Sequence, residues 1–141
     1  MTINEIQEQI IEEFALFDDW ADKYEYIIEL GKKLPPLDES EKTEDNKIKG
    51  CQSNVWLVAR LKDDKLYFEA DSDAVIVKGL VSMLIRVLSG HRPSEIVQAD
   101  LFFIEKIGMT QHLAQTRSNG LLSMVKQMKF YGLAYGAKMG V

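Results

Sequence analysis

The sequence predicts an α+β domain in which a small three-stranded antiparallel sheet is packed by helices. Three observations favour this class. Apolar residues recur at helical spacing near both ends of the chain, apolar and polar residues alternate over residues 65–71, and 46% of the 141 residues are apolar. That apolar share is enough for one hydrophobic core, so we expect residues 1–141 to form a single domain.

Two helices are expected at the N-terminal end. Thr2 and Glu5 have the spacing of a capping box, and the apolar residues that follow share one helical face as far as about residue 17. The aspartates at 18–19 are candidate caps for a second helix. Gly31 offers that helix a left-handed end.

The middle of the chain predicts an exposed loop followed by the sheet. Residues 34–46 contain two of the three prolines and five acids, and neither the helical nor the strand period survives there. Strands are then expected at 47–49, 55–59 and 65–71, because these stretches alternate or are rich in β-branched and aromatic residues. An aspartate pair supplies the turn before the last strand.

Helices return in the second half of the chain. Ser72 or Asp73 would cap an apolar helix over residues 74–89, which is too short and too charged to cross a bilayer. A polar connector is expected at 110–118. The other helices expected are 94–98, 100–107 and 121–138.

Composition and charge exclude several function classes. The 22 acids outnumber the 17 bases, and a pI of about 5.1 speaks against a nucleic-acid-binding protein. A single cysteine excludes an internal disulfide and a zinc or iron–sulfur site built from cysteines. The N-terminus lacks the features of a signal peptide, so we expect a cytoplasmic protein.

The charge is unevenly distributed along the chain. Residues 1–45 hold 14 acids and 4 bases, whereas residues 46–141 hold 8 acids and 13 bases. This division is compatible with a protein partner that presents complementary charge. The alternative is an ordinary solvated acidic face.

Cys51 is the first candidate for chemistry. It follows Gly50 at the start of a predicted strand, where a bent backbone can present a side chain from a loop. Its thiolate would be a nucleophile, and the charges of Lys47 and Lys49 could lower the pKa of the thiol unless the strand alternation points them away from it. The alternative is a small buried hydrophobic residue, the more common role of a lone cysteine.

The two histidines, His91 and His112, are the only possible partners for a cysteine–histidine hydrolase. His91 follows a predicted helix end and His112 lies in the polar connector, which are contexts typical of structural or solvated side chains. A zinc site of Cys51, both histidines and a carboxylate satisfies the ligand count, but no local ligand spacing supports it.

Taken together, these residues resemble the SufE family, the sulfur-acceptor proteins that work with cysteine desulfurases in iron–sulfur cluster assembly. The order and spacing of several motifs, spread over most of the chain, carry the resemblance. The matching positions are Trp20, Tyr24, 27–31, 34–37, 48–53, 55–57, 70–74, 76–80 and 118–121, with Arg117 directly before the last group.

The resemblance implies the α+β fold shared with IscU-type cluster scaffolds, with Cys51 as the persulfide-carrying cysteine in a loop at one end of the sheet. Those scaffolds use three cysteines and this chain has one, so it can carry sulfur but can hardly build a cluster on its own thiolates. The resemblance also places Asp73 and Arg117 where they would brace the cysteine loop. The alternatives are helix capping for Asp73 and a surface role for Arg117.

The function implied is that of a sulfur acceptor and activator of a cysteine desulfurase, without independent turnover, which passes sulfur to a downstream iron–sulfur scaffold. No metal or resident cofactor is implied, whereas the desulfurase would use pyridoxal phosphate. A persulfide must be shielded, so Cys51 is expected to lie against apolar neighbours at rest and to be exposed on docking. Neither nucleic acid nor a membrane is an expected partner, and the protein would be a monomer or a homodimer. The alternative function is a non-catalytic binding module that modulates a partner enzyme, with a structural cysteine.

Overall fold

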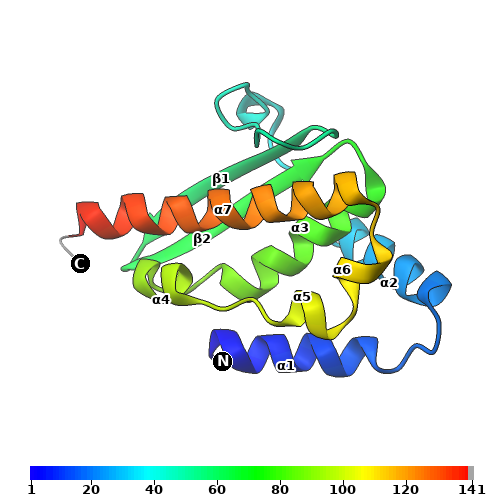
Figure 1. Cartoon of the computed structure of the whole chain (residues 1–141). Coiled ribbons are helices and arrows are strands. Elements are labelled where there is room, and N and C mark those ends of the chain that lie inside the picture. Colours follow the sequence, from blue (N-terminus) through cyan, green and yellow to red (C-terminus); the bar gives the residue numbers. More distant parts are fainter. Residues whose placement is uncertain (140–141) are drawn as a thin grey trace.

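The computed structural model describes residues 1–139, which form one β-hairpin packed against helices. The elements in chain order are α1 (Ile3–Phe14), α2 (Trp20–Lys32), the 3-10 helix η1 (Glu39–Glu41), β1 (Val55–Lys62), β2 (Lys65–Ser72), α3 (Val75–Leu88), α4 (Pro93–Gln98), α5 (Phe103–Lys106), α6 (Met109–His112) and α7 (Gln115–Lys138). Figure 1 shows the long α7 alongside the hairpin. α3 packs against β2, α1, α2 and α7 and so forms the centre of the core. The predicted α+β class is confirmed.

The sheet has two strands, so the prediction of three was wrong. β1 and β2 pair antiparallel from Val55–Ser72 to Lys62–Lys65, and their two-residue turn has positive φ at Asp63 (52°) and Asp64 (64°), as a type I′ hairpin turn requires. The expected first strand, 47–49, is reduced to a single bridge between Lys47 and Trp56. It cannot extend because the chain turns at Gly50, whose φ is +90°.

The N-terminal helices begin where the sequence predicts and end differently. The Thr2–Glu5 capping box is present, and the Asp19 side chain accepts from the backbone N–H of Asp22 at the start of α2. α1 stops at Phe14 rather than near residue 17. Gly31 does not end α2 in a left-handed conformation but lies inside the helix. At that position the absence of a side chain lets α2 approach α3 closely.

Two glycines permit this close approach of α2 to α3. A Cβ on Gly31 would lie 2.6 Å from the backbone nitrogen of Gly79, and a Cβ on Gly79 would lie 2.1 Å from the carbonyl oxygen of Ile27. Both obstructing atoms belong to backbone and cannot rotate away. The two helices can therefore pack at this distance only with glycine at both positions.

We expect Gly79→Ala to lower the free energy of unfolding by about 3 kcal/mol or more, because a helix must shift to relieve the overlap. Urea unfolding measures the change. Gly136→Ala in α7 is the matched control, since the nearest atom to its Cβ would be 3.6 Å away, at Pro93. That control should be neutral or stabilising by about 1 kcal/mol. Equal losses in the two variants would contradict the packing argument.

The second half of the chain differs from the prediction in three places. The helix expected over 100–107 is shortened to α5, Phe103–Lys106. The side chains of Ser72 and Asp73 do not cap α3, whose N-cap is Ala74; instead the Ser72 hydroxyl accepts from the N–H of Ala74 at 3.2 Å. The expected polar connector 110–118 contains the end of α6 and the start of α7, which begins at Gln115. Among residues 1–139, no helix combines the length and the apolar composition needed to span a membrane.

Candidate functional site

The Cys51 loop is bent sharply against α7. Gly50 has a φ of +90°, a conformation that residues with a side chain rarely adopt. A Cβ at this position would also lie 2.6 Å from the Ser123 hydroxyl oxygen. The backbone conformation therefore requires glycine directly before the cysteine, whereas rotation of the Ser123 side chain could relieve the close contact.

Cys51 is half-buried beside the first turns of α7. Its Sγ–H donates to the carbonyl oxygen of Gly120 at 3.6 Å. Burial raises the pKa of the Cys51 thiol, which favours the protonated form at neutral pH. The suggestion that Lys47 and Lys49 lower this pKa was therefore wrong in direction; Lys47 is paired with Glu44 at 3.2 Å instead.

We expect Cys51 alkylation to reach half its maximal rate at a higher pH in the folded protein than in the same protein unfolded in urea. The reason is that burial raises the pKa of the folded thiol, so the reactive thiolate forms at a higher pH than in the unfolded chain. By the same shift, the contribution of the buried thiol to stability is present at low pH and is lost as the pH rises through the folded pKa. A pH series with a small neutral alkylating reagent measures both midpoints. A folded midpoint at or below the unfolded one would contradict the burial argument.

The thiol opens onto a cavity of about 260 Å³ between the cysteine loop, α3 and the start of α7. The lining residues are Cys51, Gln52, Ser53, Val77, Ala114, Thr116, Arg117, Gly120 and Met124. Arg117 is exposed to solvent and is one of the residues of this wall. The structure thus brings together Cys51 and Arg117, which are far apart in the sequence.

Asp73 does not line the cavity but holds the end of the cysteine loop. Its Oδ1 accepts from the backbone N–H of Asn54 at 3.1 Å, and its Oδ2 accepts from the Asn54 side-chain amide at 2.9 Å. The carbonyl oxygen of Asn54 in turn accepts from the N–H of Asp73 at 3.3 Å. Asp73 therefore touches the residue at which the loop enters β1.

The two histidines lie outside this cavity. His91 Nε2 is 3.1 Å from the carbonyl oxygen of Met1, and His112 stacks on Trp20 with ring centroids 4.5 Å apart. Within residues 1–139, no group of three or more histidine, cysteine, aspartate or glutamate side chains is placed to hold a metal ion. The arrangement offers one thiol and one guanidinium at a partly open cavity.

Sequence reasoning did not identify the cavity walls contributed by Val77, Thr116 and Met124. A usable signal was present, because Arg117, Gly120 and Met124 are spaced three and four residues apart and so share one face of a helix. That signal is readable only once α7 is known to start at Gln115. Because residues 110–118 were predicted to be a connector, this helical spacing was not recognised.

A comparison of the sequence with profiles of known protein families shows the family of this chain. The profile of the SufE family, described as an Fe–S metabolism associated domain, matches residues 8–131. The chain belongs to the SufE family. This membership gives the chain a role in Fe–S metabolism.

Relatives of this SufE-family chain agree with the assignment. An uncharacterized SufE-like protein of Rhizobium meliloti is 47% identical over 127 residues, which cover 86% of this chain and 91% of the relative. A SufE-like protein of Synechocystis is 40% identical over 127 residues, covering 90% and 80%. The solution structure of a hypothetical protein from Thermus thermophilus has a TM-score of 0.75 at 18% identity, covering 92% of this chain and 94% of the other, and shows the same fold.

Proposed function

We propose that this SufE-family protein is a sulfur acceptor and activator of a cysteine desulfurase, which carries sulfur as a persulfide on Cys51 and passes it to iron–sulfur cluster assembly. Family membership implies the desulfurase partner. The observation that carries the proposal is the placement of the only cysteine at a partly open cavity whose wall includes Arg117. With one cysteine in the chain, a persulfide on it cannot resolve into an internal disulfide.

The transfer step is a sulfur exchange without net oxidation. The Cys51 thiol first loses its proton to water, and the thiolate then attacks the outer sulfur of a persulfide on the desulfurase cysteine. A new sulfur–sulfur bond forms on Cys51 while the old one breaks. Its electron pair leaves on the desulfurase cysteine, which becomes a thiolate. The donor persulfide is supplied by the pyridoxal-phosphate chemistry of the partner.

The cavity supports this step because it has room for the added atom. Its volume of about 260 Å³ far exceeds the roughly 15 Å³ that one water-sized probe needs. Arg117 supplies a positive charge at the wall, which complements the negative charge of a persulfide carried there. Half-burial of Cys51 limits the access of small oxidants and reductants to the carried sulfur.

We expect Arg117→Gln to slow sulfur transfer severalfold while leaving the free energy of unfolding within about 0.5 kcal/mol, because Arg117 is exposed and faces the site. Sulfur acquired per minute, followed by mass spectrometry, measures the effect. Lys62→Gln at the far end of β1 removes an exposed positive charge away from the cavity and should transfer at the wild-type rate. Equal sulfur-transfer rates for both variants would show that Arg117 has no role in sulfur transfer.

The second candidate function is a non-catalytic binding module with a structural cysteine. It is favoured by the half-burial of Cys51 and by its hydrogen bond to Gly120, which are typical of a packed cysteine. Two measurements made together, desulfurase turnover and sulfur transfer to the protein, separate this function from the proposed one. A sulfur acceptor increases alanine release from L-cysteine and becomes sulfurated, whereas a binding module changes turnover and stays unmodified. Turnover that does not respond to the protein overturns the proposed function.

A further inference from the structure

The segment 37–54, which carries Cys51, is anchored at both ends by the last two residues of β2, Asp71 and Ser72, and by Asp73 directly after it. Its last residue, Asn54, is held by Asp73 as described above. Asn54 also accepts at its carbonyl oxygen from the Ser72 hydroxyl, at 2.8 Å. The end of the segment is therefore fixed to the hairpin on two sides.

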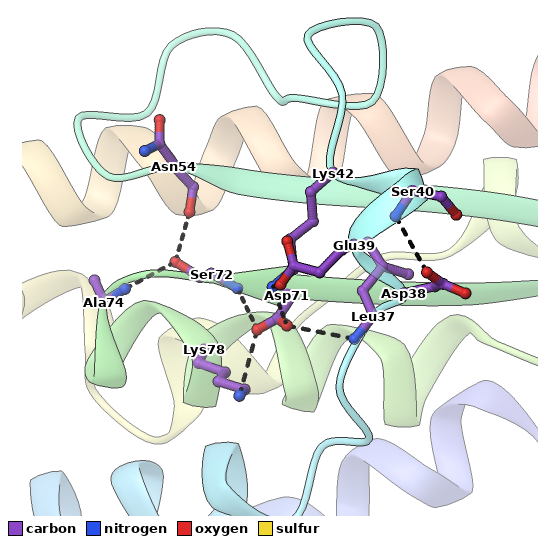
Figure 2. A network of polar contacts seen from close by, with 10 residues as sticks. All are labelled: Leu37, Asp38, Glu39, Ser40, Lys42, Asn54, Asp71, Ser72, Ala74 and Lys78. Carbon is purple, nitrogen blue, oxygen red and sulfur yellow. Dashed lines mark hydrogen bonds and ion pairs between the residues drawn. The ribbon is translucent and has the colours of Figure 1, made fainter.

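The beginning of the segment is held by Asp71, as Figure 2 shows. Asp71 Oδ2 accepts from the backbone N–H of Leu37 at 3.3 Å and lies 3.3 Å from the Lys42 Nζ. The Lys42 ammonium also lies over the Trp56 ring, 5.6 Å from its centroid. One carboxylate thus ties both the first residue of the segment and the end of η1 to the hairpin.

The other oxygen of Asp71 is fixed to the body of the protein. Oδ1 accepts from the backbone N–H of Ser72 at 2.8 Å and lies 3.3 Å from the Lys78 Nζ on α3. Asp71 is only 5% exposed, so its charge depends on these partners. Burial alone would raise the pKa of Asp71, but the N–H groups of Ser72 and Leu37 and the Lys78 ammonium outweigh it, and the pKa is lowered.

Hydrogen bonds inside segment 37–54 connect its anchored beginning to the residues just before Cys51. The Asn46 side-chain amide donates to the carbonyl oxygen of Glu41 at 2.9 Å, which ties the residues beside Lys42 to the bridge at Lys47. The bridge itself rests on two backbone hydrogen bonds, of 2.8 and 2.9 Å, to β1. A bridge this short is marginal without support from neighbouring structure. Its persistence therefore depends on the anchored residues before it.

We propose that Asp71 is a positioning residue that sets the resting place of Cys51, through its ion pair with Lys42 and its hydrogen bond to Leu37. Loss of the Lys42 contact releases the beginning of segment 37–54 and raises the population in which Cys51 is exposed. This inference rests on the proposed function in one respect, that exposure of Cys51 is what a sulfur donor needs. The apparent affinity for that donor then scales with the exposed fraction.

The test compares the Cys51 alkylation rate of the free protein, without denaturant, in matched lysine variants. Lys42→Met removes the cation on the segment side of Asp71, and Lys78→Met removes the cation on the α3 side. The two pairs have the same distance, 3.3 Å, and similar side-chain exposure, 21% and 27%. Lys42 also pairs with Glu39 at 3.0 Å, so Glu39→Gln, which removes that pair and leaves the Asp71 contact, should alkylate at the wild-type rate. Lys42→Arg keeps the charge and serves as the rescue variant.

We expect Lys42→Met to speed alkylation about fivefold, Asp71→Asn about tenfold, and Lys78→Met and Lys42→Arg less than about twofold. Urea unfolding of each variant separates local release from global destabilisation. Alkylation through global unfolding becomes strongly faster as the urea concentration rises, whereas alkylation through local release of the loop depends little on urea. Equal acceleration in Lys42→Met and Lys78→Met, or acceleration that follows the loss of global stability, would overturn the proposal. If Asp71→Asn does not fold, the three lysine variants still decide.

This measurement is independent of sulfur transfer. An unchanged alkylation rate in Lys42→Met overturns the role of Asp71 and leaves the proposed function intact. Absence of sulfur on wild-type Cys51 after incubation with a desulfurase overturns the proposed function and leaves the alkylation result intact. With a working desulfurase, Lys42→Met should also lower the half-saturating protein concentration about fivefold without changing maximal turnover, which a general loss of stability would not do.

Discussion

Replacing Cys51 with serine is expected to abolish the stimulation of desulfurase turnover, leaving the rate that the desulfurase has alone. A serine hydroxyl stays protonated at neutral pH and is a poor nucleophile toward sulfur, whereas the thiolate of cysteine attacks it. The fold should survive, because Cys51 is half-buried and makes one weak hydrogen bond, so we expect a loss of less than about 1 kcal/mol. Alanine release and urea unfolding measure the two quantities.

A control keeps the number of thiols at one. The double variant Cys51→Ser/Ala137→Cys moves the thiol to an exposed position near the end of α7, away from the cavity. It should be as inactive as Cys51→Ser alone, because the displaced thiol lacks the cavity and the loop. Stimulation by either variant at the wild-type level would rule out Cys51 as the carrier.

The second large effect expected is protection of Cys51 in the free protein. Because α7 and the core cover part of the thiol, we expect alkylation to depend on opening of the loop. If about 1% of molecules are open, alkylation should be roughly a hundredfold slower than in the protein unfolded in urea. A desulfurase whose own nucleophilic cysteine has been removed should restore most of that rate by drawing the loop out.

Two comparisons make this test specific. A desulfurase denatured before mixing controls for nonspecific effects of added protein and should leave the slow rate unchanged. Equal alkylation rates in the folded and unfolded protein would show that the loop is open at rest. In that case the shielding argument for the cavity would be wrong.

Local sequence signals predicted much of the fold because their causes are local. The Thr2–Glu5 box, the Asp19 cap and the aspartate turn act within a few residues, and each is present in the structure. The predicted third strand failed for a tertiary reason. Residues 47–49 alternate like a strand, but the turn at Gly50 leaves room for a single bridge.

The site shows the same division between local and tertiary causes. Cys51 could be singled out because it is the lone cysteine and follows a glycine, whereas its contact with α7 depends on packing between distant segments. Asp71 was not identified because strand alternation places it on the outward side of β2, with Tyr67 and Glu69. It is buried because segment 37–54 covers that side, which no strand period can reveal.

The most direct test of sulfur carriage is the intact mass of the protein after incubation with a cysteine desulfurase and L-cysteine. We predict the addition of one sulfur atom that a thiol reductant removes, located by peptide mapping on Cys51 and absent from Cys51→Ser. An unchanged mass, while the desulfurase releases alanine faster in the presence of the protein, would show that it activates its partner without accepting sulfur.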